Sequence, residues 1–501
     1  DRTAQTYTEK GAVYETTRRI SYGQLKSEAE LVADLLMTLG IGAGDKVAVA
    51  LPNWIETVTI YLATARMGAI LVPINPKYRT LEMKHILNNC SPKVIFVSEE
   101  FEHIHFDEIK PFVQQIITVR YEKPGYVSFH ELRAKTRGNA LPEMTFQVND
   151  TFCILYTSGT TNMPKGALIT HRALVQSGMI IAQSMRCTDQ DVFLIAAPIF
   201  HVFGLGCNLL SAIYCGSRMV LLDKFKARRA LELIQEEKVT IQHAVPSMFN
   251  LMLKDPDFSQ FDLSSLRAGM TGASPCPPEV VRGVRENMGM VLSISYGATE
   301  TCTVTITDYD DKEDRIYHTV GKVVPGAEVK IVNDLREEVN NGEIGEIACR
   351  GFGVMKGYYQ LPDQTREVLD EDGWYYTGDL GWMDNEGYIR FVGRKKEIII
   401  RGGFNIYPHE IEDLIKTHPK VIESAVLGLP DPVMGEIACA VVQLRPGESA
   451  TPEEVIDYLK GRVAPYKLPS KVVFMDELPT TASGKMQKNR LKEKLLQTKN
   501  W

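Results

Sequence analysis

Strand-length apolar runs alternate with helical segments over the first hundred residues. Residues 46–51 have the pattern of a buried strand that stops at Pro52, residues 55–67 have helical periodicity, and residues 69–73 return to a strand pattern. Parallel strands need crossover connections, so this alternation predicts βαβ units. The same texture recurs between about 170 and 300. We therefore expect an α/β fold in which mostly parallel sheets carry flanking helices.

The texture changes after about residue 318, where short alternating runs are separated by glycines. This is typical of a small antiparallel β region, here expected as a β-barrel-like subdomain. A compact α+β unit follows, with helices predicted near 409–417 and 452–462. A chain of 501 residues is too long for one ordinary core. We expect a large N-terminal domain over 1–395 and a small C-terminal domain over 396–501.

The overall composition excludes several classes of protein. The net charge of −7 argues against binding to nucleic acid. The nine cysteines are scattered singly, which favours reduced thiols and a cytoplasmic protein. Neither they nor the ten histidines have metal-ligand spacing, and no apolar run approaches the ~18 residues of a membrane span. The sequence begins at Asp1 without a signal-peptide pattern.

The segment Tyr156–Gly166 gathers small hydroxyl residues and glycines around Lys165, directly after the apolar run 152–155. Small residues let a backbone approach a ligand, hydroxyls and amides donate to anionic oxygens, and lysine adds a mobile positive charge. This pattern favours a polyphosphate loop, although a flexible connector would have a similar composition. It is not the GxxxxGK[ST] loop, because Lys165 precedes Gly166. Thr170 is the expected N-cap of the next helix.

Four further motifs lie downstream. Each alone could be an ordinary turn or a solvated surface segment. In chain order they are Tyr296-Gly297-Ala298-Thr299-Glu300, Tyr375 to Gly381 around Asp379, Gly393-Arg394 continuing to Gly402-Gly403-Phe404, and Leu478 to Lys485.

The five motifs in this order resemble the superfamily of adenylate-forming enzymes, which includes acyl-CoA and aryl-CoA synthetases, adenylation domains and firefly luciferase. The resemblance extends from the region of Tyr22 to Lys485. It implies an enzyme that activates a carboxylate with ATP and Mg²⁺ and then transfers the acyl group to a thiol such as coenzyme A. Bringing two anions together is the difficult step, so positive charge and dipoles should dominate the catalysis.

The resemblance also implies a role for each motif. The phosphate loop would bind the β- and γ-phosphates, Tyr296 would stack near adenine, and Asp379 and Arg394 would bind the ribose. Thr157 and Glu300 would lie at the magnesium ion. The expected nucleotide set is Thr157, Ser158, Gly159, Thr160, Thr161, Lys165, Tyr296, Thr299, Asp379 and Arg394.

Lys485 would bridge the attacking carboxylate and the α-phosphate, and with Lys165, Glu300 and His201 it completes the expected catalytic set. In the family the C-terminal domain rotates, and Lys396 occupies the hinge position. The rotation would remove Lys485 from the site and bring up the wall of a pantetheine tunnel, here Gly402, Gly403 and Phe404.

The acid pocket is expected around the apolar segment 198–204 and the segment 271–274. A lone histidine on an apolar stretch is often a core residue, but the motif context favours a substrate contact for His201. The expected pocket residues are His201, Phe203, Gly272, Ala273, Gly297 and Ala298.

Two positions depart from the family pattern. Asn162 stands where most relatives have glycine, and Ile294 stands where many carry an amide facing adenine. Asparagine tolerates positive φ, so the loop conformation is compatible with it. At Ile294 base recognition would depend more on backbone groups.

The favoured function is a fatty acyl-CoA synthetase for a medium or long chain. An aryl-CoA ligase of the coumarate or benzoate kind and an enzyme that loads a carrier protein are the alternatives within the superfamily. A binding protein that has lost catalysis is disfavoured because Lys165, Glu300 and Lys485 are all present. A homodimer and a peripheral membrane contact stay open.

Overall fold

The structure is a computed structural model that describes residues 1–501 except 17, 140, 142–145, 158–162, 481–485 and 499–501. It divides into two compact units. The first contains residues 1–328 and 349–375, and the second contains residues 329–348 and 376–501. The α/β class expected from the sequence is confirmed, because mostly parallel sheets with helices make up the first unit.

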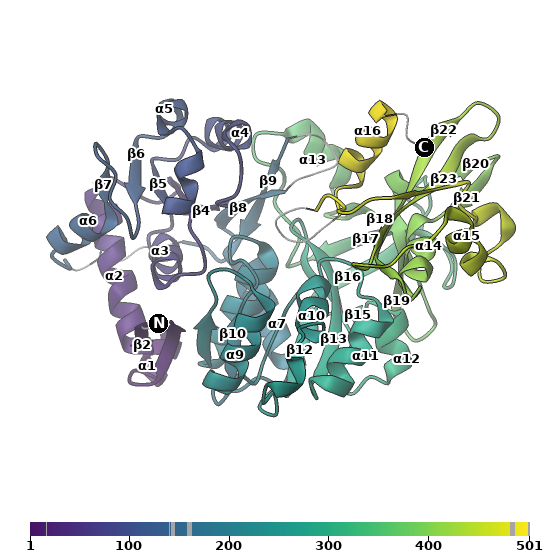
Figure 1. Ribbon diagram of the computed structural model, residues 1–501. Helices are drawn as coiled ribbons and strands as arrows, with labels where there is room; N and C mark the ends of the chain where they lie inside the picture. Colours follow the sequence, from purple (N-terminus) through teal and green to yellow (C-terminus); the bar gives the residue numbers. More distant parts are fainter. Residues whose placement is uncertain (17, 140, 142–145, 158–162, 481–485, 499–501) are drawn as a thin grey trace. The chain divides into compact units, whose positions relative to one another are not determined.

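The first unit contains a seven-stranded sheet in the order β7-β6-β5-β3-β4-β8-β9. All neighbours are parallel except β8 and β9, which form an antiparallel pair. Figure 1 shows this sheet in the purple and blue part of the ribbon, among helices α2 to α6. Its strands are β3 (Lys46–Ala50), β4 (Ile70–Pro73), β5 (Val94–Val97), β6 (Gln115–Thr118), β7 (Val127–Ser128), β8 (Thr151–Thr157) and β9 (Lys165–Thr170). The helices are α2 (Tyr22–Thr38), α3 (Ile55–Arg66), α4 (Thr80–Cys90), α5 (Phe106–Ile109) and α6 (Phe129–Lys135).

Two four-stranded sheets complete the strands of this unit, in the orders β10-β11-β1-β2 and β12-β13-β14-β15. Ile241 forms single parallel bridges to Phe193 of β10 and Ala268 of β12, so one residue links the two sheets. The strands are β1 (Gly11–Glu15), β2 (Arg18–Ser21), β10 (Val192–Ile195), β11 (Arg218–Leu221), β12 (Ala268–Thr271), β13 (Val291–Ala298), β14 (Cys302–Ile306) and β15 (Lys322–Val323). The remaining helices of the unit are α1 (Arg2–Thr6), α7 (His171–Ser184), α8 (Ser211–Cys215), α9 (Ala227–Glu237), α10 (Pro246–Leu253), α11 (Pro278–Asn287), α12 (Glu313–His318) and α13 (Pro362–Val368).

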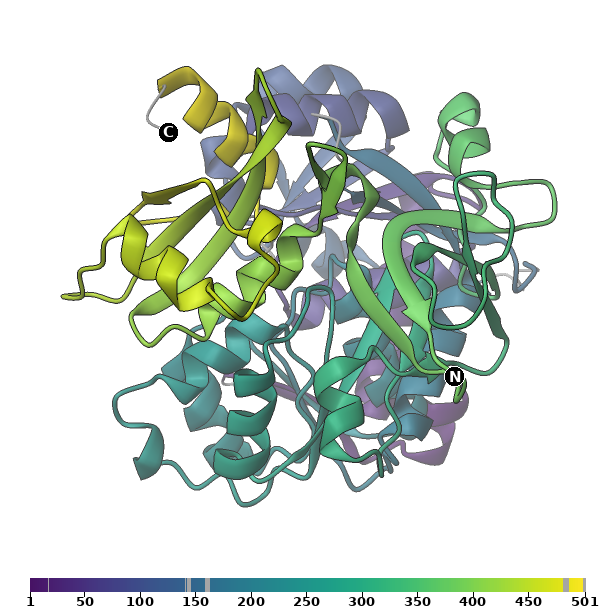
Figure 2. The same cartoon turned by 90° about the vertical axis from the view of Figure 1, so that its right-hand side faces the viewer.

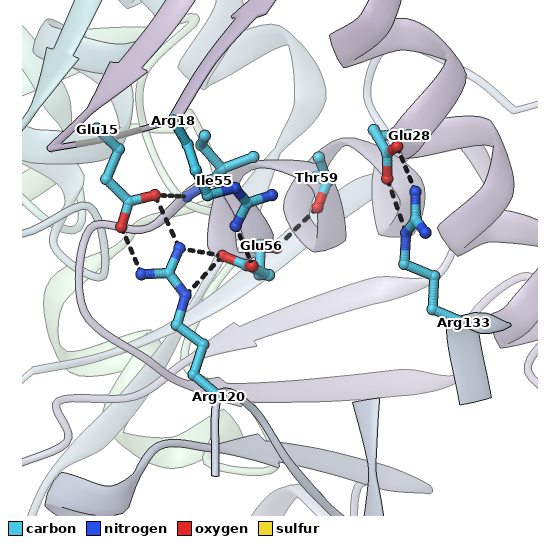
Figure 3. A network of polar contacts seen from close by, with 8 residues as sticks. All are labelled: Glu15, Arg18, Glu28, Ile55, Glu56, Thr59, Arg120 and Arg133. Atoms are coloured by element: carbon cyan, nitrogen blue, oxygen red, sulfur yellow. Dashed lines mark hydrogen bonds and ion pairs between the residues drawn. The ribbon is translucent and has the colours of Figure 1, made fainter. Parts of the chain in front are cut away.

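An ion-pair network fixes the start of α3 in this unit (Figure 3). Glu15 of β1 is only 7% exposed and accepts hydrogen bonds from both terminal nitrogens of Arg120 and from the backbone of Ile55. Arg120 also donates to Glu56, which pairs with Arg18 as well. Bidentate, charge-assisted bonds have demanding geometry, so the network sets the position of the turn before α3.

The second unit is built on the antiparallel β22–β23 hairpin (Val421–Asp431 and Gly435–Leu444), in a sheet that also includes β20 (Ile399–Arg401), β21 (Phe404–Ile406) and β24 (Lys471–Phe474). Alternate side chains of the hairpin enter two different cores. Val426 and Ala440 pack with α14 (Pro408–Lys416) and α15 (Pro452–Leu459), whereas Leu427 and Cys439 pack with α16 (Lys488–Thr498). Figure 2 shows α16 as the yellow helix beside this hairpin.

A four-stranded sheet in the order β16-β17-β18-β19 carries the other candidate residues of this unit. Its strands are β16 (Ala327–Val332), β17 (Gly345–Gly351), β18 (Tyr375–Met383) and β19 (Ile389–Arg394). The expected limit between the two domains, at 395/396, stays a prediction. Among the described residues, no helix is long and apolar enough to cross a bilayer.

Candidate functional site

The strands β8 and β9 hold the two ends of the predicted phosphate loop. They pair antiparallel, with Thr157 opposite Lys165, so both side chains emerge at the same end of the hairpin. Pro164 is held by a helix outside the hairpin, because its carbonyl oxygen lies 2.9 Å from Nε2 of His85 on α4. The predicted loop residues Ser158, Gly159, Thr160 and Thr161, and Asn162 with them, lie outside the described residues.

Glu300 lies beside this end of the hairpin. Its Oε1 is 3.5 Å from the hydroxyl of Thr157, and the hydroxyl of Tyr358 donates to the same Oε1 at 3.0 Å. Thr157 and Glu300 offer the hard oxygen ligands that Mg²⁺ prefers, and the contacts that the described residues make to the carboxylate go to Oε1, which leaves Oε2 for a cation. The donor set therefore fits a magnesium ion that keeps further sites for phosphate oxygens.

Tyr358 connects Glu300 to Lys165. The Nζ of Lys165 lies 4.9 Å from the centre of the Tyr358 ring, within the range of a cation–π contact. Burial, and then the charge of Glu300, raise the pKa of Tyr358 well above its usual value, so the hydroxyl stays protonated.

The end of β13 carries the motif Tyr296-Gly297-Ala298-Thr299. Tyr296 is 9% exposed, so little of its ring reaches the surface. A side chain on Gly297 would meet the carbonyl oxygen of Cys302 at 1.8 Å, which explains why glycine stands there. The side chain of Ile294 is buried in the core with Leu292 and Met290.

The segment that leads to His201 is held by one buried amide. Asn53, 2% exposed, donates to the carbonyls of Ile195, Ala197 and Leu222 and accepts from the backbone of Ile199. Asn53 lies two residues before Ile55, whose backbone donates to Glu15. A buried amide with all these bonds is costly to replace, so this contact fixes the start of the predicted acid pocket.

The predicted pocket residues are uncharged. Burial lowers the pKa of His201 to about 4, so its ring is neutral at pH 7. Phe203 opens a π-helix, η3 (Phe203–Leu210), and its ring lies 3.8 Å from where a side chain on Gly272 would begin. Ala273 has a φ of +66°, a conformation that a residue with a Cβ rarely adopts. Such backbone strain is concentrated at functional sites.

In the second unit, Asp379 of β18 and Arg394 of β19 are direct cross-strand partners. Arg394 Nε lies 3.1 Å from Asp379 Oδ1, and the aspartate side chain is 7% exposed. The two residues expected to bind ribose are thus brought together as an ion pair.

Glu346 of β17 holds two residues that lie next to this ion pair. Its Oε1 accepts from the backbone of Gly378 at 2.9 Å, and its Oε2 lies 3.1 Å from Lys395 Nζ. These are the neighbours in sequence of Asp379 and Arg394. Gly378 has a φ of +72°, which glycine adopts without strain.

The remaining predicted residues belong to the second unit too. Gly402 and Gly403 have positive φ, Phe404 is 57% exposed and stacks on Tyr466 at 4.8 Å, and Lys396 is exposed. Lys485 lies outside the described residues, and Thr480 and Met486 form an isolated antiparallel bridge.

Sequence reasoning missed Tyr358, Asn53 and Glu346. The pattern around Tyr358, Gly357-Tyr358-Tyr359, carries no chemical signature beyond two aromatics. Asn53 resembled a strand-ending turn residue, and Glu346 resembled the polar side of an alternating strand. Their roles depend on contacts between segments far apart in the chain, which local patterns do not encode.

Comparison with known proteins agrees with this geometry. Residues 1–359 match the family model described as AMP-binding enzyme, and residues 410–485 match that of the AMP-binding enzyme C-terminal domain. The chain is 37% identical to a putative acyl-CoA synthetase, YngI, of Bacillus subtilis, with 100% of this chain and 97% of that protein covered. It is 36% identical to the medium-chain fatty-acid–CoA ligase of Escherichia coli, with 95% and 86% covered.

Solved structures of similar fold include an anthranilate CoA ligase, AuaEII, in complex with anthranoyl-AMP. Its TM-score is 0.93 at 28% identity, and 100% of this chain and 97% of that chain are covered. ATP-bound MatB from Rhodopseudomonas palustris follows with a TM-score of 0.89 at 30% identity and 98% of both chains covered. The chain therefore belongs to the AMP-binding enzyme family, and within it to the acyl-CoA synthetase branch.

Proposed function

We propose that the protein joins a medium-chain fatty acid to coenzyme A, using ATP and Mg²⁺. The observation that carries the proposal is the cluster of Thr157, Glu300, Tyr358 and Lys165 at the end of the β8–β9 hairpin. It joins a carboxylate suited to Mg²⁺ with a lysine suited to phosphate. The similarity to medium-chain acyl-CoA ligases supports the substrate class.

The reaction has two displacements. A carboxylate oxygen attacks the α-phosphorus of ATP and pyrophosphate leaves; the thiol of CoA then attacks the acyl carbon and AMP leaves. Mg²⁺ would offset the charge of the polyphosphate. Lys165 would bind the outer phosphates, Tyr296 and Thr299 would lie near the adenosine, and Asp379 with Arg394 would bind the ribose.

The acid would enter beside His201, Phe203, Gly272 and Ala273, with Gly297 and Ala298 at the pocket floor. The neutral ring of His201 can donate a hydrogen bond to the carboxylate without a permanent charge. No charge on these residues would attract an ammonium group, which favours a fatty acid over an amino acid.

We further propose that the C-terminal domain, from Lys396 onward, turns between the two steps. Lys395 is held by Glu346, and Glu397 is held by Lys488 at the start of α16, so Lys396 lies between two anchored residues. A hinge absorbs rotation at such a position. Gly402, Gly403 and Phe404 would then line the path of the pantetheine arm.

Lys485→Ala tests the two-step scheme. It should abolish adenylate formation while the variant still makes thioester from a supplied acyl-adenylate and CoA. Equal loss of both half-reactions would contradict a domain that alternates between them.

An aryl acid is the second candidate, because the anthranilate CoA ligase has a closely similar fold. ATP–pyrophosphate exchange with acetate, octanoate, decanoate, palmitate, benzoate and coumarate separates the candidates. We expect the strongest exchange with octanoate or decanoate and thioester formation with free CoA. Exchange that responds only to benzoate or coumarate would select the aryl function, and exchange without CoA thioester would select a carrier-protein acceptor.

A cytoplasmic location follows from the same proposal, supported by nine free cysteines. A homodimer and a peripheral membrane contact are further proposals, which light scattering and vesicle sedimentation would test.

A further inference from the structure

We infer that Tyr358 is a positioning residue that sets both the magnesium carboxylate and the phosphate lysine. This inference rests on the proposed function and deepens it, because it assigns a role to a residue outside the expected set. One hydroxyl and one ring of the same side chain reach the two charged groups of the cluster: Glu300 Oε1 at 3.0 Å and Lys165 Nζ at 4.9 Å.

The backbone around Tyr358 is fixed to the strand that follows the phosphate loop. Tyr358 bridges Ala167 of β9, the backbone N–H of Tyr359 donates to Gly166 at 2.7 Å, and that of Leu168 donates to Gly357 at 3.0 Å. The backbone N–H of Tyr358 itself donates to the hydroxyl of Thr365. The side chain is 8% exposed. A residue held at so many points can position others, because it has little freedom of its own.

The hydroxyl of Tyr358 decides which oxygen of Glu300 is presented to a metal. Among the described residues, both contacts to the carboxylate, from Thr157 and Tyr358, go to Oε1. This leaves Oε2 for a cation. Two hydroxyl groups that donate to the same oxygen hold the carboxylate in one orientation before a ligand binds.

The aromatic ring of Tyr358, in contrast to its hydroxyl, positions Lys165. An ammonium held over an aromatic face is already restricted in its side-chain motion. Less conformational freedom is then lost when phosphate binds. Two substitutions separate the functions: Tyr358→Phe removes the hydroxyl and keeps the ring, whereas Tyr358→Leu removes both. Tyr359→Phe is the matched control, because the hydroxyl of this neighbouring tyrosine contacts only the side chain of Gln360 among the described residues.

The test is equilibrium binding of ATP, with and without Mg²⁺, in the absence of any acid. We expect Tyr358→Phe to keep metal-free ATP binding and to lose about tenfold of the gain in affinity that Mg²⁺ provides, the size of a hydrogen bond to a charged group. Tyr358→Leu should in addition weaken metal-free ATP binding severalfold. Thermal unfolding of each variant without ligand establishes that it is folded.

A Tyr358→Phe variant with the same Mg²⁺ gain as Tyr359→Phe would overturn the hydroxyl role. Equal metal-free binding by the Phe and Leu variants would overturn the ring role. Because no acid takes part, these outcomes are separate from a failure of the proposed function, which would appear as wild-type protein that binds MgATP but exchanges pyrophosphate with no acid.

Discussion

Two charged parts of the molecule, one in each unit, are built in different ways. The phosphate cluster of the first unit is assembled from residues 157, 165, 300 and 358, three segments of the chain that lie far apart in sequence. The ribose pair of the second unit comes from two neighbouring strands, where Asp379 faces Arg394. A cross-strand pair forms whenever its hairpin forms. The cluster forms only when the whole unit has folded.

The two parts also differ in how charge is balanced. Asp379 is paired with Arg394, whereas the contacts that the described residues make to Glu300 come from two hydroxyl groups, which leave its charge in place. A neutral pair suits the uncharged hydroxyls of a ribose, and an uncompensated carboxylate suits a cation. The difference predicts that the first part controls turnover and the second controls nucleotide affinity.

The largest expected effect separates these roles. Glu300→Gln should lower kcat for pyrophosphate exchange by roughly a thousandfold, because it removes charge where the transition state needs a bound cation. Asp379→Asn should act mainly on the KM for ATP, since it weakens contacts made equally in the ground state. Steady-state kinetics at saturating Mg²⁺ measures both. A fall in kcat of the same size for both variants would remove the distinction.

A smaller expected effect is the loss of stability of each unit at acidic pH. Burial lowers the pKa of His201 to about 4 in the first unit and that of His409 to about 3 in the second. Each is below the unfolded value of about 6.5, so the unfolded chain takes up protons first. The free energy of unfolding keeps its full value above pH 6.5. It falls as the pH drops toward the pKa of the folded state, by up to ~1.4 kcal/mol per pH unit for each histidine.

Hydrogen-exchange protection factors at pH 7 and pH 5 read the two units separately. We expect protection to fall in both. His409→Phe should remove part of the acid loss in the second unit alone. Acid loss in the second unit that persists unchanged in this variant would show that other groups cause it.

The sequence predicted the parallel strands of the first unit and the helices of the second because periodicity is local. Helix α7 begins at its predicted cap Thr170, whose hydroxyl accepts from Ala173. Helix α15 ends at Leu459, short of the predicted 462, because Lys460 turns to an extended ψ of 133°. The π-helix at 203–210 could not be predicted, since it depends on close packing against α7 at Gly178.

The site residues also divide into those with a local sequence signal and those whose role depends on distant segments. Thr157, Glu300, Asp379 and Arg394 stand in motifs with recognisable spacing, and the structure brings Thr157 to Glu300 and Asp379 to Arg394. Their roles in binding stay predictions. Asn53 and Tyr358 had no such signal, because a buried amide or tyrosine acquires its role only from the carbonyls and carboxylates that other segments place around it.

The smallest effect tests the ribose pair through Glu346. Glu346→Ala removes the acceptor for Gly378 and one of the two carboxylates that pair with Lys395, the other being Asp334, so Asp379 and Arg394 lose part of their support without being altered themselves. We expect the KM for ATP to rise about tenfold, the size of one charged hydrogen bond, with kcat nearly unchanged. Glu338→Ala is a matched control, because Glu338 lies near Glu346 in the sequence but makes neither of these contacts.

Deoxy-ATP makes this test specific for the ribose. If Glu346 acts through hydroxyl recognition by Asp379, removing the 2′-hydroxyl should cost the wild type affinity and cost Glu346→Ala much less, because the variant has already lost that contact. A purely structural role for Glu346 would instead weaken ATP and 2′-deoxy-ATP by the same factor. Glu346→Gln should fall between, since its amide oxygen still accepts from Gly378 but carries no charge for Lys395.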